Sequence, residues 1–443
     1  MVLAAIQEPM ITVGIADRQP EVAGSLNGHF LIEGIGLVSG PFHARPAASG
    51  LELLDEGQRV IARSSSIRLV AREGSTFTIF GVTIGIRFHW ERKEDQVFQG
   101  NLVLTAREDT GIAVINEILV EDYLVSVISS EMSGRSPGEF LKAHAIMSRS
   151  WLLAALDGKD ASAAATTCAH NPGELIRWYN REDHDIFDVC ADDHCQRYQG
   201  ITKIISDEAA RAVKQTKGTV LSYGDKVCDA RYYKACGGLT ENYETAWEDT
   251  PVPYLVSVAD SSIPFTPVAA EEDANRWIFS SPDAYCNTKD EALLAEILPG
   301  FDRETRQFFR WKVEYGRSEL EDIIRQKSGL DLGTLHEITP LERGPSGRIR
   351  RLRITGSKQS VVIGKELEIR RWLSPSHLFS SAFVITVKRG PDGVPEGFIF
   401  DGAGWGHGVG LCQIGAAVMA SKGFTARQIL EHYFTGAVIK KLY

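Results

Sequence analysis

The stretch that decides this fold spans residues 121–149 and reads EDYLVSVISSEMSGRSPGEFLKAHAIMSR. Leu124, Val127 and Ile128 recur at helical spacing, so we expect a short amphipathic helix with Glu131 at its C-terminal end. A Gly-Arg-Ser turn follows directly, and a carboxylate beside such a turn faces a groove rather than a core. That position suits a general acid. The alternative is that Glu131 is one more solvated carboxylate among 58 acidic residues.

A second helix is predicted directly after this turn. Ser136 is a good N-cap, Pro137 suits the first helical position, and Glu139 completes a capping box. The helical pattern continues through about Leu156. We therefore expect two helices joined by a short turn, with Glu131 at the junction.

The bulk composition excludes several classes of function. A chain of 443 residues is ample for two or three domains or for one large elaborated domain. The net charge is −10 and the pI is near 5.7, and no basic cluster is dense enough to indicate nucleic acid or an anionic membrane as a partner. No apolar run reaches transmembrane length, and the first residues, MVLAAIQ, lack the basic start of a signal peptide.

Four soft or borderline metal ligands lie within twelve positions, and we call them the loop cluster: His184, Cys190, His194 and Cys195. Two thiolates and two imidazoles match the tetrahedral preference of Zn²⁺. Four protein ligands leave no position for a reactive water, which argues against a zinc hydrolase. The predicted cofactor is one structural Zn²⁺ that pins a loop.

Two alternatives compete with this zinc site. Cys190 and Cys195 could form a local disulfide or stay unpaired, with both histidines on the surface. Cys168 and His170 form a second pair upstream, but Cys-x-His alone cannot complete a site.

A glycine-rich stretch, residues 398–415, reads FIFDGAGWGHGVGLCQIG and contains neither the Gly-x-Gly-x-x-Gly nor the Gly-Lys-Ser/Thr pattern of nucleotide-binding loops. Alternating glycines indicate a backbone that bends tightly or is approached closely. Trp405 and His407 then stand on a nearly bare backbone, which suits a sugar ring and its hydroxyls. The alternative is a structural turn with Trp405 packed inward.

The block around Glu131 resembles the SpoIID/LytB family, which takes its name from a peptidoglycan lytic transglycosylase. The matching positions are Tyr123, Leu124, Val127, Ser130, Glu131, Met132, Pro137, Leu141, Lys142, Ala143, Ala145 and Arg149. In that family the Glu before Met is the catalytic acid, which implies the same role for Glu131. The chain departs from the family at His144, where Gln is usual, and at 148–151, which read SRSW instead of ARTY.

The loop cluster belongs to a second block of resemblance. Residues 195–200 match the family's Cys-Gln-x-Tyr-x-Gly signature through Cys195, Gln196, Tyr198 and Gly200. Some members hold zinc there with two Cys and two His, and those positions fall on the loop cluster.

Two further blocks resemble the family with a cysteine in place of its serine. Residues 404–436 follow the family's closing motif almost position for position, with Cys412 where Ser is common. Residues 230–242 are similar to a Ser-Gly-Gly-x-Thr loop, with Cys236 at the Ser position. This departure raises an alternative in which Cys236 is a thiol nucleophile with a partner such as His407.

The separated blocks predict an α+β fold: a single discontinuous mixed core with a β-rich N-terminal insertion and a smaller mixed α/β insertion. The expected SpoIID-like core combines residues 11–25, 111–260 and 386–443, the β-rich insertion covers 26–110, and the accessory segment covers 261–385. Alternating patterns predict strands at 30–32, 75–80 and 101–105, helices near 288–298 and 317–329, and further strands at 335–341, 348–355 and 360–363.

The resemblance implies a lytic transglycosylase that cleaves the MurNAc-GlcNAc β-1,4 linkage of peptidoglycan glycan strands and leaves 1,6-anhydro-MurNAc ends. Glu131 would act as the single general acid/base, because no water attacks and no second carboxylate is needed. Candidates for positioning the strand, expected to converge with Glu131 on one groove, are Arg149, Gln196, Tyr198, Thr240, Trp405 and His407.

The alternative function is a non-catalytic wall-binding or amidase-enhancing module, as LytB-type relatives are described. Either function implies peptidoglycan glycan strands as the partner, with a cell-wall amidase or another wall-remodelling protein as a further candidate and no nucleic acid. An exported, periplasmic or cell-envelope location is expected from the function, although no signal peptide is visible in the sequence.

Overall fold

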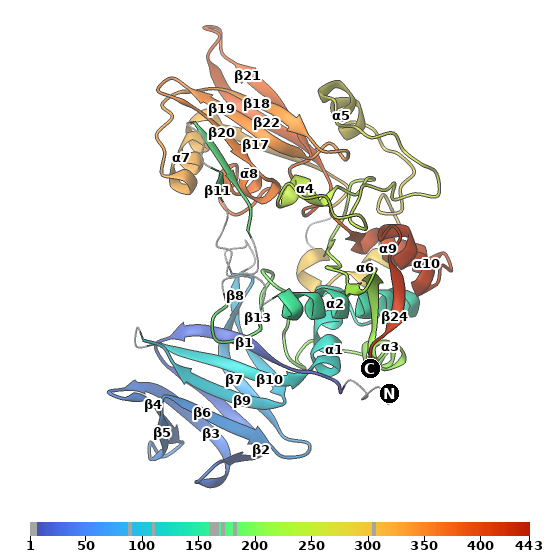
Figure 1. Ribbon diagram of the computed structural model, residues 1–443. Coiled ribbons are helices and arrows are strands. Elements are labelled where there is room, and N and C mark those ends of the chain that lie inside the picture. The colour runs from blue at the N-terminus through green and yellow to red at the C-terminus, as the bar shows by residue number, and fades with distance from the viewer. Residues whose placement is uncertain are drawn as a thin grey trace.

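The computed structural model describes residues 7–86, 91–108, 111–158, 168–169, 173–179, 184–303 and 307–443. Helices and strands occur throughout, in several separate sheets, so the predicted α+β class is confirmed. Figure 1 shows a strand-rich N-terminal lobe at one end, a second strand-rich lobe at the other, and a group of helices between them.

The N-terminal lobe is one eleven-stranded sheet. Its strands are β1 (Met10–Gln19), β2 (Val22–Ile32), β3 (Gly36–Ala47), β4 (Gly50–Asp55), β5 (Val60–Ser64), β6 (Ser66–Ala71), β7 (Thr76–Ile84), β8 (Arg92–Gln99), β9 (Asn101–Ala106), β10 (Ile112–Leu119) and β13 (Val189–Cys190). They run in the order β13-β1-β10-β9-β6-β2-β3-β4-β5, and β7 pairs with β2 and β8. The three strands predicted in the β-rich insertion coincide with β2, β7 and β9.

Strand β1 carries the loop cluster on one side and the helices on the other. It pairs antiparallel with β10, which leads directly into the first helix, and parallel with β13, where Gly14 lies opposite Cys190. A Cβ atom at Gly14 would lie 2.6 Å from the Phe187 ring, so only glycine lets the strand pack this closely. One strand thus fixes the loop cluster relative to the helix that ends at Glu131.

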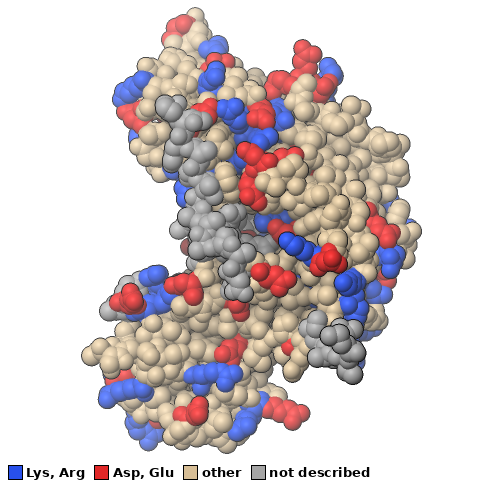
Figure 2. Space-filling model, in the orientation of Figure 1, with Lys and Arg blue, Asp and Glu red and all other residues tan. Residues whose placement is uncertain are grey.

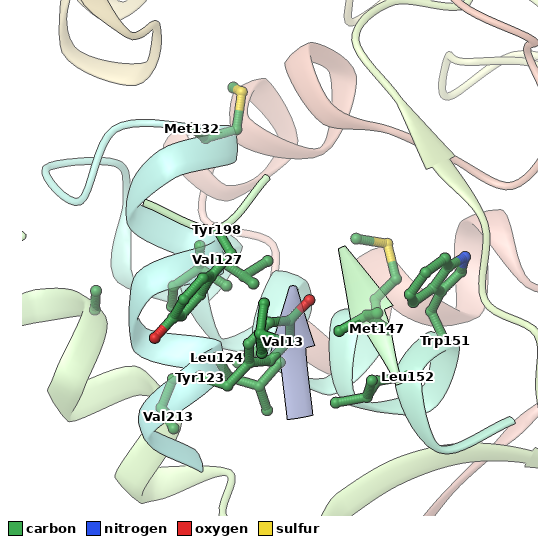
Figure 3. Packing of buried hydrophobic residues seen from close by; sticks show 14 of the residues in the cluster. Val13, Tyr123, Leu124, Val127, Met132, Met147, Trp151, Leu152, Tyr198 and Val213 are labelled. Carbon is green, nitrogen blue, oxygen red and sulfur yellow. The ribbon is translucent and has the colours of Figure 1, made fainter. Parts of the chain in front are cut away.

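Helices α1 (Val120–Glu131) and α2 (Gly138–Asp157) confirm the two helices predicted from the sequence, with Glu131 as the last residue of α1. The buried face of α1 packs on α2 and β1. Figure 3 shows Val13 of β1 between Leu124 of α1 and Met147 of α2, and all three are fully buried. The apolar spacing of the sequence therefore placed the correct face inward.

The predicted capping box at the start of α2 is wrong. Pro137 is the N-cap, and no side chain caps the helix. Ser136 is buried and donates its hydroxyl to the carbonyl of Ser133, 2.7 Å away, so it closes the turn instead. The Glu139 carboxylate accepts a hydrogen bond from the backbone N–H of Ala426 at 2.7 Å, because the C-terminal helices pack against this end of α2.

The second lobe has a hydrophobic core of its own, formed by residues between Trp311 and Phe400. Its elements are β11 (Cys168–Ala169), β12 (Glu174–Arg177), β17 (Arg310–Gly316), α7 (Arg317–Ser328), β18 (Leu335–Arg343), β19 (Ile349–Gly356), β20 (Ser360–Gly364), α8 (Glu366–Trp372), β21 (Phe383–Arg389) and β22 (Pro395–Ala403). The sheets are ordered β11-β12-β20-β19-β18 and β17-β22-β21. Helix α7 and strands β18, β19 and β20 coincide with the predicted ones, whereas the division into core and insertions stays a prediction.

The remaining elements surround α1 and α2: α3 (Glu208–Gln215), β14 (Thr219–Tyr223), β15 (Lys226–Val227), β16 (Tyr232–Tyr233), α4 (Tyr243–Ala246), α5 (Glu271–Ile278), α6 (Glu291–Ile297), the 3₁₀ helix η2 (Gly300–Arg303), β23 (Leu411–Cys412), α9 (Gln413–Ser421), α10 (Ala426–Tyr433) and β24 (Val438–Lys441). Helix α6 coincides with the predicted helix near 288–298. Strand β16 pairs parallel with β23, and β24 pairs antiparallel with β14, so the end of the chain returns to the helices.

Charged side chains of both signs are interspersed over the described residues visible in Figure 2. None of the helices in the described part of the chain combines the length and the apolar character that a membrane crossing needs.

Candidate active site and metal centre

Glu131 lies at the last position of α1, and 9% of its surface is exposed. Its Oε1 atom accepts two hydrogen bonds, one from the backbone N–H of Arg197 at 3.0 Å and one from the phenol of Tyr232 at 2.9 Å. The Lys234 ammonium donates to the backbone carbonyl of Glu131 at 3.1 Å. The carboxylate is therefore fixed in orientation by two separate segments, the loop that holds Arg197 and strand β16.

The second carboxylate oxygen of Glu131 is left for another partner. Among the described residues, Oε2 accepts no hydrogen bond, and Glu131 keeps 9% of its surface exposed. The two cations near Glu131 are already neutralised. The Arg197 guanidinium binds Asp193 at 2.8 Å, and the Lys234 ammonium binds Asp302 at 2.7 Å.

Tyr232 is a site residue that sequence reasoning missed. Burial, with the Glu131 carboxylate beside it, holds the pKa of Tyr232 well above its ordinary value, so the phenol stays a hydrogen-bond donor. Its ring lies 5.1 Å from the ring of His144, between centroids. The only sequence signal was its place in the segment 230–242 that resembles a family loop.

His144, which stands where the family usually has Gln, is buried on α2 and lies beside Tyr232. Its Nδ1 lies 3.2 Å from the Ser148 hydroxyl and its Nε2 lies 3.1 Å from the side-chain amide of Gln413. Burial, with the Lys234 charge nearby, lowers the pKa of His144 to about 3. The imidazole is therefore neutral and couples α2 to α9 behind Tyr232.

Arg149, predicted to position the glycan, is fully buried. Its guanidinium forms a bidentate pair with Glu121, at 2.9 and 2.5 Å, and also donates to the carbonyl of Thr219 at 2.9 Å. Glu121 in turn accepts from the backbone N–H of Gly218 at 3.0 Å. These contacts join α1, α2 and β14, so Arg149 offers no surface to a sugar in this structure.

Gln196, Tyr198 and Thr240 are also buried, with at most 1% of their surface exposed. The Gln196 amide accepts from the Tyr123 phenol at 3.3 Å and donates to the carbonyl of Ser148 at 3.3 Å. Tyr198 stacks on Tyr123, with ring centroids 5.1 Å apart. Gln196 directly precedes Arg197, whose backbone N–H binds Glu131, which favours support of Glu131 over contact with sugar.

Thr240 closes a turn of the loop that follows β16. Its hydroxyl donates to the carbonyl of Val256 at 3.2 Å and accepts from the backbone N–H of Val258 at 2.7 Å. Both hydrogen-bonding roles of the hydroxyl are thus used inside the protein.

Trp405 and His407 keep part of their surface exposed, unlike the other four predicted glycan-positioning residues. Trp405 nevertheless packs against Phe379 and Phe308, with ring centroids 4.6 and 5.0 Å away. His407 accepts a hydrogen bond from the backbone N–H of Val409 at Nδ1, 3.1 Å away. The partial exposure of both residues fits a sugar platform, and the packing of Trp405 fits an inward-packed turn.

His407 reaches the surroundings of Glu131 through Tyr232. Burial, with Arg231 and other cations nearby, holds the pKa of His407 well below its ordinary value, and the ring hydrogen-bonds to the Tyr232 backbone. The phenol of the same tyrosine binds Glu131. That Glu131 and His407 line one groove stays a prediction.

The alternating glycines of this turn are required by its backbone. Gly404, Gly406, Gly408 and Gly410 have φ values of 77°, 98°, 86° and 84°, in the left-handed region that other residues avoid. A Cβ atom at Gly408 would lie 2.4 Å from the guanidinium of Arg348. The predicted tight bend and close approach are therefore confirmed.

The loop cluster brings its four ligand atoms together, all within 4.8 Å of one another. Nε2 of His184 lies 3.1 Å from Sγ of Cys195, and Nδ1 of His194 lies 3.5 Å from the same sulfur. Both cysteines are free thiols. Hydrogen bonding with Cys195, and then with the two histidines, holds the pKa of Cys190 well below its ordinary value, which favours the thiolate that binds metals.

This donor set fits Zn²⁺, and the ion would hold the loop that leads to Arg197. Three neighbouring aspartates bind groups other than the histidine rings. Asp185 pairs with Arg107 at 2.9 Å, Asp188 accepts from Thr12 at 2.8 Å, and Asp193 pairs with Arg197. The Cys168–His170 pair lies outside the residues whose side chains the structure describes.

A cavity of about 270 Å³ lies beside the loop cluster. Its walls include Gly14 of β1, Thr83 of β7, Cys190 and Tyr198. Glu131, Thr240, Trp405 and His407 do not line it. The cavity therefore belongs to the junction of the N-terminal lobe with the loop cluster.

The thiol-nucleophile alternative finds no support in the position of Cys236. Its side chain is 2% exposed, and its sulfur lies 3.4 Å from that of Cys286. His407 binds Val409 and the Tyr232 backbone instead. A buried thiol surrounded by other thiols cannot contact a polymeric substrate.

The family comparison agrees with this geometry. Residues 108–223, which hold Glu131 and the loop cluster, match the stage II sporulation protein family, SpoIID. The chain contains a SpoIID domain. A second match, to a domain of unknown function (DUF8618), covers residues 241–410 and so includes the second lobe.

The similarity to SpoIID proteins extends beyond this domain, over about three quarters of two relatives. The chain is 24% identical to stage II sporulation protein D of Bacillus amyloliquefaciens over 331 residues, which cover 74% of this chain and 76% of that protein. It is 24% identical to stage II sporulation protein D of Bacillus subtilis over 327 residues, with the same coverage. It is also 25% identical to the amidase enhancer of Bacillus subtilis over 245 residues, 52% of this chain and 32% of that protein.

Proposed function

We propose that this SpoIID protein is a lytic transglycosylase that cleaves the MurNAc-GlcNAc β-1,4 linkage of peptidoglycan. The observation that carries this proposal is the way in which the two carboxylate oxygens of Glu131 are bound. One carboxylate oxygen is held by Arg197 and Tyr232, and the other accepts no hydrogen bond from the described residues. A general acid needs this combination of fixed orientation and one free oxygen.

The surrounding carboxylates support a mechanism with one acid rather than two. A hydrolase of the usual kind needs a second carboxylate as nucleophile or base. Asp193 and Asp302, which reach the site through Arg197 and Lys234, are each paired with their cation. They are therefore poor candidates for the second role.

In the proposed reaction, protonated Glu131 donates its proton to the glycosidic oxygen as the bond from that oxygen to C1 of the muramic acid breaks. The resulting carboxylate then takes the proton of the C6 hydroxyl of the same sugar while that oxygen bonds to C1. The products are a free GlcNAc hydroxyl and a 1,6-anhydro ring. Glu131 ends in the protonated state in which it began, and no water is consumed.

The zinc of the loop cluster has a structural role in this proposal. His184, Cys190, His194 and Cys195 would hold it, and it would supply no open coordination position. Its effect on the site passes through the backbone, because Arg197 follows Cys195 by two residues and donates its N–H to Glu131.

A non-catalytic amidase-enhancing role is the second candidate, favoured by the similarity to the amidase enhancer of Bacillus subtilis. Mass analysis of glycan fragments, after purified peptidoglycan strands are incubated with the protein, separates the two. Fragments with anhydro ends, lighter than hydrated ends by one water, are expected. Hydrated ends would replace the proposal with a hydrolase, and intact strands would favour the enhancer.

A further inference from the structure

Three of the cysteines converge on one buried point together with an aspartate: Cys236, Asp260, Cys286 and Cys412, which we call the core cluster. They come from four separate segments: the loop after β16, the stretch before α5, the turn between α5 and α6, and the start of α9. None of the four is more than 3% exposed. Sequence spacing gives no hint of this convergence.

We infer that the core cluster is a second, structural metal site, formed by three thiolates and one carboxylate around a single Zn²⁺. This inference rests neither on the proposed activity nor on metal binding by the loop cluster. Sulfur-rich ligand sets select zinc over the hard cations Mg²⁺ and Ca²⁺, which take oxygen ligands.

The distances within the core cluster fit one ion. All four ligand atoms lie within 4.8 Å of one another, and Sγ of Cys236 lies 3.4 Å from Sγ of Cys286. A tetrahedron with Zn–S bonds of about 2.3 Å has edges of about 3.8 Å, so atoms at these separations can share one ion. A disulfide would need the sulfurs about 2.05 Å apart. No pair of these cysteines is bonded, since all three are free thiols.

The backbone around the sulfurs is arranged as it is around metal-bound thiolates. The sulfur of Cys412 accepts from the N–H groups of Cys236 at 3.3 Å and Gly415 at 3.4 Å, and the sulfur of Cys236 accepts from the N–H of Gly238 at 3.3 Å. Cys412 is also the N-cap of α9, where the helix dipole favours a negative charge. Such outer contacts orient the ligands and stabilise their charged forms.

The aspartate of the cluster is oriented in the same way. Its Oδ1 accepts from the phenol of Tyr433 at 2.5 Å, and its Oδ2 accepts from the N–H of Cys286 at 2.8 Å. A bound carboxylate normally has such partners for its remaining lone pairs. Asp260 is fully buried and pairs with no basic side chain in the described contacts, so a metal ion would supply the missing positive charge.

Two arginines, Arg348 fully buried and Arg310 partly buried, add positive charge next to the core cluster. Arg310 donates to the carbonyl of Gly237 at 2.9 Å, and Arg348 donates to the carbonyl of Cys236 at 3.3 Å. Four anionic ligands exceed the charge of one Zn²⁺ by two, and these two guanidinium groups offset that excess. The site is closed, so the ion would be structural.

The inferred ion would also hold one side of Glu131 in place. Tyr232 and Lys234, which bind the carboxylate and carbonyl of Glu131, precede Cys236 by four and two residues. The segment between them and the metal is short, so a displaced Cys236 would move both contacts.

Elemental analysis of the full chain, purified under reducing conditions without added metal, tests this inference. In a Cys190→Ser variant, which damages the loop cluster, about one equivalent of zinc should remain, set by the closed four-ligand core site. X-ray absorption of that remaining zinc should show three sulfur neighbours at about 2.3 Å and one oxygen at about 2.0 Å. Cys286→Ser should lose one equivalent, and Cys190→Ser with Cys286→Ser should lose both.

Cys228→Ser is the matched control, because Cys228 is as buried as the core cysteines but lies outside both clusters. It should keep the wild-type zinc content. A metal-free Cys190→Ser protein, or remaining zinc with two sulfur and two nitrogen neighbours, would overturn the inference. So would a Cys236–Cys286 disulfide in peptides from the wild-type protein kept under reducing conditions. All of these measurements use the wild-type protein and the Cys190→Ser variant. The inference can therefore be tested even if Cys286→Ser does not fold.

Discussion

The loop cluster and the core cluster hold Glu131 from two sides, but they are assembled in different ways. The loop cluster closes a segment of twelve residues and leads to the Arg197 N–H that binds Glu131. The core cluster joins segments up to 176 residues apart and leads to Tyr232 and Lys234. The first is visible in the sequence and the second emerges only from the fold. A local cluster of ligands and a nonlocal one therefore lead to contacts with the same carboxylate.

The largest expected effect distinguishes the two clusters by stability. Closing a loop of 176 residues constrains the unfolded chain more than closing one of 11 residues, by about 2.5 kcal/mol from the logarithmic length dependence. We therefore expect Cys286→Ser to cost about 5 kcal/mol of unfolding free energy, and Cys190→Ser about half of that. Denaturant unfolding of both variants, beside Cys228→Ser, measures the difference. Equal losses of unfolding free energy in the two variants would show that the length of the closed loop does not distinguish the two clusters.

Arg149 and Glu121 form an ion pair between residues distant in sequence, and no metal is involved. Its effect on stability can be compared with that of the two clusters. Arg149→Met should cost about 3 kcal/mol or more, because it leaves the carboxylate of Glu121 buried without its cation. The KM for glycan should not change. Adding Glu121→Gln should restore part of the stability. A raised KM at unchanged stability would instead return Arg149 to the sugar-binding role predicted from the sequence.

Tyr232→Phe tests the side of Glu131 that the core cluster supports. It removes one hydrogen bond to a carboxylate, a contact worth about 1.5–3 kcal/mol, so kcat should fall about 10- to 100-fold. The free energy of unfolding should fall by no more than this hydrogen bond contributes. An unchanged kcat would remove Tyr232 from the site.

The smallest effect concerns His144, which packs behind Tyr232. Its pKa in the folded protein is about 3, below the value near 6.5 of an unfolded chain. The unfolded state therefore binds the proton first, so stability falls as pH drops below about 6.5, by at most 1.4 kcal/mol per pH unit. His144→Gln should flatten this loss. The measurement is denaturant unfolding from pH 7 to pH 5, and an identical slope in the variant would contradict the assignment.

Local patterns predicted helices α1, α2, α6 and α7 and six of the strands, and nonlocal contacts explain the errors. The spacing of Leu124, Val127 and Ile128 correctly placed Glu131 at a helix end, because that pattern depends on neighbours three and four residues away. The capping box failed because the backbone of Ala426, distant in sequence, takes the Glu139 carboxylate. Tyr232 was missed for the same reason, since it reaches Glu131 across 101 positions.

The residues predicted to contact sugar also show that a local pattern does not reveal contacts distant in sequence. Gln196, Tyr198 and Thr240 belong to motifs that resemble the family, and a motif identifies a site without saying which side chains face the substrate. The structure buries all three. Burial depends on how β1, α1 and α2 pack together, which no single segment of the sequence encodes.

The measurement that tests the central claim most directly is the rate at which the Glu131→Gln variant releases anhydro-ended fragments from glycan strands. Glutamine keeps the shape and accepts the hydrogen bonds of Arg197 and Tyr232 but cannot donate and retrieve a proton, so the rate should fall by about 10²–10⁴-fold with folding and zinc content unchanged. Glu208→Gln, an exposed carboxylate on α3, should keep the wild-type rate. Release of anhydro ends by Glu131→Gln at the wild-type rate would contradict the account.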